Sequence, residues 1–285
     1  MIPDPVPVRS AAADAAAHER LRPRLQGIAY RMLGSMAEAE EVVQDTWLRW
    51  HGAAPGTIDN LEAWLVTVTT RLAIDRYRAA RARREHYVGF WLPEPVLTED
   101  AGGDLTGGPF GGGVDGEPPA TPEQLLERAD DLSVAFLALL ERLAPEARAA
   151  FLLREVFDVD YADVARILDK SEAACRQLVH RARTQLRDER PRYRVPDDTH
   201  RRLLQAFADA AAGGDFAALQ ALLDEGAELI GDGGGKVPSF GKVLRGGRRI
   251  AQLFLAGSRR HGAGVRLHVQ RNPDKLARLA AAFPG

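Results

Sequence analysis

The chain has 285 residues, of which 45% are hydrophobic and 27% are charged, so it is long enough for two or three domains with real cores. A formal net charge of −2 excludes a protein that is basic throughout, and any binding of nucleic acid must come from local patches. The single cysteine, Cys175, excludes an internal disulfide and a cysteine-based zinc site. Because the sequence shows neither a signal peptide nor eighteen consecutive apolar residues, we expect a soluble cytoplasmic protein.

Apolar residues at helical spacing predict a first helix over residues 18–33, with Gly34 as its stop. The proline- and alanine-rich residues 1–17 before it are expected to be frayed. Residues 35–38, Ser-Met-Ala-Glu, have the form of a capping box, in which Ser and Glu satisfy each other's free backbone N–H groups. The helix that this box opens is expected to end near Trp50.

This second helix carries an acidic run with no basic residue before Arg49. The acids are Glu38, Glu40, Glu41 and Asp45. Acids in the first turn suit the positive end of the helix dipole, which is the structural interpretation. The functional interpretation is a docking surface for a basic partner, and the pattern leaves both open.

A third helix begins near Asn60, and its later part contains six arginines within fourteen residues, opposed only by Asp75. The arginines are Arg71, Arg76, Arg78, Arg81, Arg83 and Arg84. Tyr77 and Tyr87 lie among them or just beyond. Arginines interleaved with aromatic rings suit a surface that tracks a nucleic-acid backbone and stacks on bases. The alternative is a solvated helix end, where the dipole favours cations.

Residues 90–95, Phe-Trp-Leu-Pro-Glu-Pro, place two large rings beside two prolines. Such a segment cannot form a helix and is usually clamped against another surface. Residues 101–122 contain eight glycines and four prolines, a composition that predicts a flexible linker and a domain boundary.

Residues 121–190 are predicted to form a small four-helix domain that ends in a helix-turn-helix over residues 160–187. The turn contains Asp169 and Lys170 but no glycine, so Asp169 is expected to take the left-handed conformation. Ser171 is the expected N-cap of the second helix.

One side of that second helix is expected to be buried, through Ala174, Leu178, Ala182 and Leu186. The opposite side carries Arg176, Gln177, His180, Arg181, Arg183 and Arg187. Arginine and glutamine side chains on one helix can contact base edges and phosphates. The alternative is a solvated basic side of an ordinary helical hairpin. We expect Cys175 beside them to be a packing residue rather than a redox switch.

The last part of the chain, residues 198–285, is predicted to be an α+β domain. Two helices precede a strand over residues 227–230, a glycine turn over residues 231–236 and a second strand from Val237. An amphipathic helix over residues 248–260 and a strand over residues 265–269 follow. The turn, GDGGGK, lacks the spacing of a phosphate-binding loop and no helix follows it, which disfavours nucleotide binding.

Three segments resemble the extracytoplasmic-function sigma factors of bacterial RNA polymerase. AEEVVQDTWLRW (residues 39–50) resembles the family's helix for binding core polymerase. EAWLVTVTTRLAIDRYRAARARRE (62–85) resembles its helix for the −10 element, and YADVARILDKSEAACRQLVHRARTQLR (161–187) resembles its −35 reader. WLPEP (91–95), DGGGK (232–236) and NPDKL (272–276) further resemble the group with a SnoaL-like C-terminal extension.

The resemblance implies a role for each surface. Core polymerase would be bound by Glu38, Glu41, Gln44 and Asp45. The −10 element would be contacted by Thr67, Arg71, Arg76, Arg78 and Arg81. The −35 element would be contacted by Ser171, Arg176, Gln177, His180, Arg181 and Arg183. Contacts between the C-terminal domain and the rest would use Trp91, Leu92, Pro93, Asp232, Lys236, Asn272, Asp274 and Lys275.

The resemblance implies a multidomain protein with two all-α helical domains and a C-terminal α+β SnoaL-like cone. The expected bounds are 18–88 for the sigma-2-like domain, 89–120 for the linker, 121–190 for the sigma-4-like domain and 198–285 for the regulatory domain. A cone needs a long curved sheet, yet only Gln270 and Arg271 separate Val269 from Asn272. We therefore expect an incomplete cone.

Two other functions are weighed against a sigma factor that works with core polymerase and promoter DNA. One is a stand-alone helix-turn-helix regulator, which would bind duplex DNA tightly without polymerase. The other is an enzyme in the C-terminal domain, with Asp232, His268 and Asp274 as acid–base groups. Turn-forming roles explain both aspartates, however. We expect no catalytic residue, metal, cofactor or membrane partner.

Overall fold

The computed structural model describes residues 11–53, 58, 60–84, 87, 90–95, 134–188, 197–223, 225–237, 239, 242–258, 268–270 and 275–276. The chain divides into two compact units. The helical unit comprises Met1–Glu85 and Pro93–Glu189, and the C-terminal unit comprises His86–Leu92 and Arg190–Gly285. The linker predicted over residues 101–122 lies outside the described residues.

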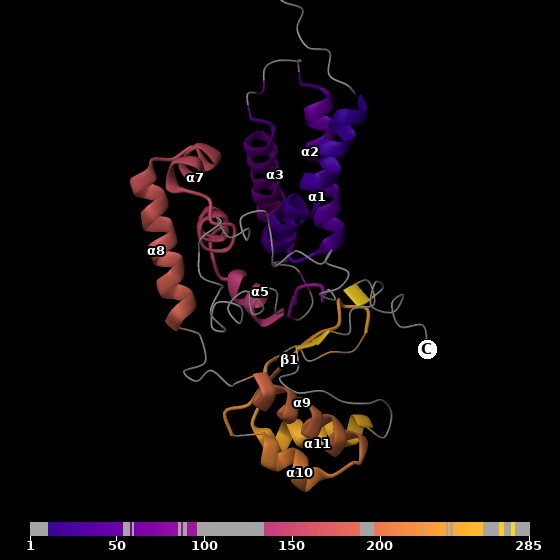
Figure 1. The fold of residues 1–285 in the computed structure, drawn as a ribbon. Helices are drawn as coiled ribbons and strands as arrows, with labels where there is room; N and C mark the ends of the chain where they lie inside the picture. The colour runs from indigo at the N-terminus through magenta and orange to yellow at the C-terminus, as the bar shows by residue number, and fades with distance from the viewer. Residues whose placement is uncertain are drawn as a thin grey trace, which may run out of the picture. The chain divides into compact units, whose positions relative to one another are not determined.

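Three long helices begin the helical unit and lie side by side, as Figure 1 shows in indigo and violet. They are α1 (Ala11–Leu33), α2 (Met36–His51) and α3 (Leu61–Arg84). The first helix begins earlier than predicted, because residues 11–17 are almost all alanine, the residue with the highest helix propensity. Their alanine content had been taken as a sign of fraying, which was wrong. Gly34, with φ of 68°, ends α1 as predicted.

The N-terminus of α2 is capped by Ser35, whose hydroxyl accepts a hydrogen bond from the Glu38 N–H at 3.5 Å. The reciprocal half of the predicted capping box does not come from Glu38, which pairs with Arg83 instead. Glu94 makes a different contact, because its Oε2 accepts from the N–H of Met36, the first residue of α2, at 2.9 Å. The first turn of α2 is therefore held by a carboxylate from the WLPEP segment, 58 residues away.

Over residues 134–188, which the structure describes, the helical unit has five further segments. They are α5 (Val134–Leu140), α6 (Pro145–Phe151), the single π-turn η1 (Leu152–Val156), α7 (Tyr161–Leu168) and α8 (Glu172–Asp188). In the turn between α7 and α8, Asp169 has φ of 54° and ψ of 52°, which confirms the predicted left-handed residue. The Ser171 hydroxyl accepts from the Ala174 N–H at 3.2 Å, which confirms the predicted N-cap.

The buried side of α8 is rotated slightly from the predicted stripe. Cys175, Val179, Ala182 and Leu186 are buried, whereas Ala174 and Leu178 are only partly buried. The four buried residues follow one another at spacings of three or four positions, so they lie on one side of the helix. Cys175 is fully buried in this core, and burial raises the pKa of its thiol, as a packing residue requires.

The two helical regions pack against each other through common apolar clusters. Leu25, Val43 and Leu65 from α1–α3 belong to one cluster with Leu153 and Phe157. A second cluster joins further residues of α1–α3 to α5, α6 and α8, among them Leu33, Leu137 and Leu186. Burial of this kind contributes about 1.5–3 kcal/mol for each large side chain. The two regions are therefore associated by their cores in this conformation.

In its described residues, the C-terminal unit has three helices and a small mixed sheet. Its elements are α9 (Asp197–Ala212), α10 (Phe216–Leu222), β1 (Glu228–Asp232), β2 (Leu244–Arg245), α11 (Gly247–Ser258) and β3 (His268–Gln270). The strand order is β2-β1-β3, with β1 antiparallel to β2 and parallel to β3. Phe207, Leu219 and Ala251 form the centre of its helical core.

The glycine turn of this unit begins later than predicted. Strand β1 continues through Gly231 and Asp232, and the chain turns at Gly233, where a Cβ would lie 2.3 Å from the Val237 carbonyl oxygen. Val237 itself is not in a strand, which corrects the prediction, and the antiparallel partner of β1 is β2. The described residues contain three short strands, fewer than a SnoaL-like cone needs. The predicted shortage of sheet is consistent with this.

No helix in the described residues has both the length and the apolar character needed to cross a membrane.

Candidate polymerase and promoter surfaces

The exposed side of α2 combines acidic, polar and apolar side chains. Glu41, Gln44 and Leu48 follow one another at three- and four-residue spacing and are all exposed. The Leu48 residue is 59% exposed, the largest such value for a large apolar residue among the described residues. Sequence reasoning missed Leu48, although its spacing from Glu41 and Gln44 was visible. An exposed leucine in a row with a glutamate and a glutamine suits a protein–protein interface.

Arg76 connects this acidic surface to the arginine helix α3. Its guanidinium forms ion pairs with Glu41 and, at 2.7 Å, with Asp45. The side chains involved are 29–64% exposed, so the pairs are screened by solvent. Residues that the sequence assigned to polymerase and to the −10 element are thus brought together in this conformation.

Other arginines predicted for the −10 element also have partners inside the unit. Arg71 Nε and Nη2 donate to the carbonyls of Ile167 and Arg166 at 2.9 and 3.1 Å, at the C-terminal end of α7. Arg78 pairs with Asp75 and with Glu146 of α6. Thr67 was also predicted to contact the −10 element, and its hydroxyl donates to the Ala63 carbonyl at 2.7 Å. Arg81 is exposed on the same helix.

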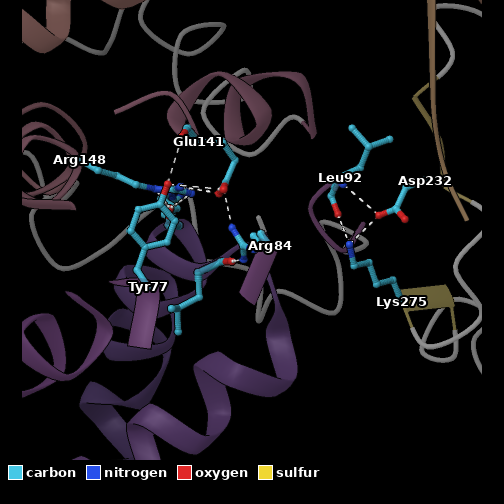
Figure 2. A network of polar contacts seen from close by, with 9 residues as sticks. Tyr77, Arg84, Leu92, Glu141, Arg148, Asp232 and Lys275 are labelled. Carbon is cyan, nitrogen blue, oxygen red and sulfur yellow. Dashed lines mark hydrogen bonds and ion pairs between the residues drawn. The ribbon is translucent and has the colours of Figure 1, made fainter. Parts of the chain in front are cut away.

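A cluster of charged side chains joins α1 and α3 to α5–α6, as Figure 2 shows. Arg148 is completely buried, and its Nε and Nη2 donate to the Arg31 carbonyl at 3.0 and 2.8 Å. Its Nη1 contacts Glu141 at 2.5 Å, and Glu141 also pairs with Arg84. The Arg148 guanidinium lies 4.7 Å from the centre of the Tyr77 ring.

This cluster satisfies backbone groups that the end of a helix leaves free. Arg84 Nη2 donates to the Leu33 carbonyl at 2.9 Å, so two arginines together cap the last turn of α1. The Tyr77 hydroxyl donates to the Glu141 carbonyl at 3.2 Å, and burial raises the pKa of this tyrosine. The cluster is thus a buried polar contact between the two helical regions.

The exposed side of α8 contains the predicted −35 residues. Gln177, His180 and Arg181 are exposed on it. Arg183 forms a two-pronged ion pair with Glu155 of η1 at 2.8 and 2.7 Å, and Arg176 pairs with Glu172 at 2.6 Å. Ser171 is exposed, with its hydroxyl in the N-cap.

In the C-terminal unit, the completely buried Asp232 accepts hydrogen bonds from Tyr87, Gly234, Leu92 and Lys275. Its Oδ1 accepts from the Tyr87 hydroxyl at 2.6 Å and from the Gly234 N–H at 2.9 Å. Its Oδ2 accepts from the Leu92 N–H at 2.9 Å and from Lys275 Nζ at 2.7 Å, as Figure 2 shows. Burial alone would raise the pKa of this carboxyl, but these hydrogen bonds outweigh it and lower the pKa.

Lys275 completes the same site. Its Nζ donates to the Leu92 carbonyl at 2.6 Å and lies 4.3 Å from the centre of the Trp91 ring. Trp91, Leu92, Asp232 and Lys275, all predicted from the sequence, are therefore in one contact site of this unit. Tyr87, which the sequence placed beside the basic patch for base stacking, instead contacts Asp232.

The structure describes two of the remaining predicted regulatory residues. Pro93 is buried, but it belongs to the helical unit, and Lys236 is exposed in the glycine turn. Asn272 and Asp274 lie outside the described residues.

Comparison with known proteins agrees with this geometry. Residues 17–83, which cover most of α1–α3, match the family Sigma-70 region 2, and residues 133–186, which cover α5–α8, match Sigma-70, region 4. The chain is 37% identical over 249 residues to the ECF RNA polymerase sigma factor SigJ of Mycobacterium tuberculosis (strain H37Rv), over 87% of this chain and 74% of that protein. The chain belongs to the ECF RNA polymerase sigma factors.

Two further relatives support this membership. A probable ECF RNA polymerase sigma factor, SigI of Mycobacterium tuberculosis (strain CDC 1551 / Oshkosh), is 33% identical to this sigma factor over 211 residues, which are 74% of this chain and 67% of that protein. The crystal structure of Mycobacterium tuberculosis SigJ superposes with a TM-score of 0.62 at 34% identity, over 88% of this chain and 78% of that chain.

Membership confirms the family that the three sequence segments suggested. Sigma factors are non-enzymatic transcription initiation factors, so the enzymatic interpretation of Asp232, His268 and Asp274 is not retained. The hydrogen bonds that Asp232 accepts from Tyr87, Leu92, Gly234 and Lys275 are consistent with a structural role for this carboxylate.

Proposed function

We propose that this sigma factor binds core RNA polymerase through α2, contacts the −10 element through α3 and contacts the −35 element through α8. It acts in the cytoplasm, and its C-terminal unit, with the incomplete SnoaL-like fold, regulates it in cis. The observation that carries the proposal is the match of sigma region 2 and region 4 to the two helical regions that display these three surfaces. Arg176, Gln177 and His180 address base edges, while Arg181 and Arg183 contact phosphates.

The experiment is transcription in vitro from a library of promoter fragments, with full-length protein and core polymerase. We expect promoter-specific transcripts only when both proteins are present. A gel shift without polymerase is the matched comparison, because a stand-alone regulator would bind duplex DNA tightly there. Tight specific binding without polymerase, together with no specific transcript after core enzyme is added, would reject the proposal.

The conformation described here must open before both promoter elements can be bound. The position numbers of the −10 and −35 elements place them about 25 base pairs apart. This separation is about 85 Å along B-form DNA. In this structure Arg71 of the −10 surface instead donates directly to the backbone of α7 in the −35 reader. We therefore infer that core polymerase holds the two helical regions apart.

The cis regulation proceeds through Tyr87, Leu92 and Glu94. Tyr87 and Leu92 are held by Asp232 and Lys275, whereas Glu94 holds the N-terminus of α2, the proposed polymerase-binding helix. Only Pro93 separates Leu92 from Glu94, and proline has a fixed φ. A ligand or partner that alters the Asp232 site would therefore act on the cap of α2.

Leu48 provides a test of the polymerase-binding surface. Leu48→Ala is expected to weaken binding of core polymerase by about 1–2 kcal/mol, or about five- to thirtyfold, because an exposed apolar side chain loses a buried contact. Fluorescence anisotropy of labelled protein titrated with core enzyme measures this. Leu203→Ala is the matched control, since Leu203 is the other exposed large apolar residue among the described residues. Equal effects of the two substitutions would contradict the assignment.

A further inference from the structure

The first residue of α7, Tyr161, contacts a proposed base-reading residue. The guanidinium carbon of Arg176 lies 4.8 Å from the centre of the Tyr161 ring. Arg176 Nη2 also donates to Glu172 Oε2 at 2.6 Å, one helical turn earlier in α8. The Arg176 side chain is otherwise half exposed, so these two contacts define its direction.

The Tyr161 ring is itself held in place from its own side of the helix-turn-helix. A second guanidinium, that of Arg154 in η1, lies 5.3 Å from the centre of the same ring. Arg154 in turn donates to Asp158 Oδ1 at 3.1 Å and to the Val159 carbonyl at 3.2 Å. Tyr161 also packs, half buried, against the apolar core of the helix-turn-helix. The ring is therefore a firm surface for Arg176.

An aromatic ring that restricts the rotamers of an arginine favours base recognition by that arginine. A free arginine side chain loses rotamer entropy when one geometry is fixed. Specific pairing with guanine requires the planar guanidinium to approach O6 and N7 at a fixed angle. A contact that already limits the rotamers reduces this loss on binding. The contact between the Arg176 guanidinium and the Tyr161 ring is expected to contribute more than the exposed ion pair with Glu172.

We propose that Tyr161 is a positioning residue for promoter recognition, which orients Arg176 so that its guanidinium selects one base pair of the −35 element. This inference rests on the proposed function of α8. Tyr161 does not contact the base; it acts through Arg176. Its removal therefore lowers the preference at the single position that Arg176 contacts and leaves the other positions unchanged.

The test uses full-length protein with core polymerase and a promoter library that is randomised through the −35 region, with sequencing of the transcripts. Arg176→Ala first identifies the position at which base preference is lost. Tyr161→Leu is then expected to reduce the base preference at that position about two- to fivefold. This factor corresponds to the free energy of an exposed cation–π contact. Tyr161→Phe keeps the ring and is expected to retain the parent preference. Combining Tyr161→Leu with Arg176→Ala is expected to add nothing further.

The outcomes separate the two proposals. If the parent protein yields no promoter-specific transcript, the proposed function fails and this inference fails with it. If Arg176→Ala changes one position but Tyr161→Leu changes none, or lowers all positions equally, only the positioning role is overturned. A loss for Tyr161→Phe as large as that for Tyr161→Leu also overturns it, because the ring would not be the cause. Urea unfolding of each variant accompanies the assay, and a selective change at one position is not produced by lower stability.

Discussion

Replacement of Asp232 by alanine is expected to lower the free energy of unfolding of the C-terminal unit by about 3–5 kcal/mol. The Asp232 side chain is fully buried and Lys275 is only 12% exposed, so the substitution leaves a nearly buried ammonium without its carboxylate. The Tyr87 hydroxyl and the Leu92 N–H lose the same acceptor. Residues 87–92 should consequently be released from this unit.

Chemical denaturation and amide hydrogen exchange of full-length protein measure the two effects. Asp232→Asn should cost less, about 1–3 kcal/mol, because the amide oxygen still accepts hydrogen bonds but carries no charge. The matched control is Asp209→Ala, which removes an exposed aspartate of the same unit and should change stability by no more than about 0.5 kcal/mol. Similar results for Asp232→Ala and Asp209→Ala would refute the structural role of the Asp232 site.

The pH dependence of stability supplies an independent check on the same carboxylate. Because the pKa of Asp232 is lowered in the folded protein, its stabilisation is present above the ordinary carboxyl pKa of about 4 and is lost as the pH falls through the lowered value. Parent protein should therefore lose more stability than Asp232→Asn when the pH is lowered below about 4. Transcription by the variant should also differ from the parent, since Leu92 is two residues from Glu94, which accepts from the Met36 N–H at the N-terminus of α2.

Arg148→Ala is expected to destabilise the helical unit by about 3–5 kcal/mol, since it removes a completely buried charge from a network and leaves a cavity. The Arg31 carbonyl loses both of its donors from this side chain, and Glu141 keeps Arg84 as its one ionic partner among the described residues. Because the network joins the two helical regions, the variant should also open more readily.

Urea unfolding gives the change in stability, and small-angle X-ray scattering of the native protein gives the change in compactness. Arg166→Ala is the control: its side chain is 65% exposed and pairs with Asp163, an interaction worth at most about 1 kcal/mol. The radius of gyration should increase for Arg148→Ala and stay the same for Arg166→Ala. An Arg148→Ala protein as stable and as compact as the control would show that the cluster does not hold the helical regions together.

Local structure in the helical unit was predictable because its causes lie within a few residues. Ser35 and Ser171 accept from backbone N–H groups three residues ahead, and Asp169 takes the left-handed conformation that its turn demands. The same holds for membership in the sigma family, since whole helices carry its patterns. Periodicity also predicted most of the buried residues, with an error of about one position in α8.

The C-terminal sheet was predicted less well, because short strands depend on distant partners. Whether residues 237–239 or 244–245 pair with β1 is decided by the tight turn at Gly233 and by the register of β2. In the same way, the sequence pointed to Asp232 and Lys275 as functional residues but did not identify the groups that they contact. Tyr87 was assigned to DNA for this reason, although it donates to Asp232.

By itself the sequence determined the helices, their caps, the sigma family and the three surfaces with their charges. Tertiary structure decided how those charges are paired: Arg76 with Glu41 across 35 residues, Arg148 with the end of α1 across 117, and Lys275 with Leu92 across 183. The physical reason is that a helix cap or an apolar repeat is set by near neighbours along the chain. An ion pair or a buried hydrogen bond instead depends on which distant backbones the packing of the core brings within 3 Å.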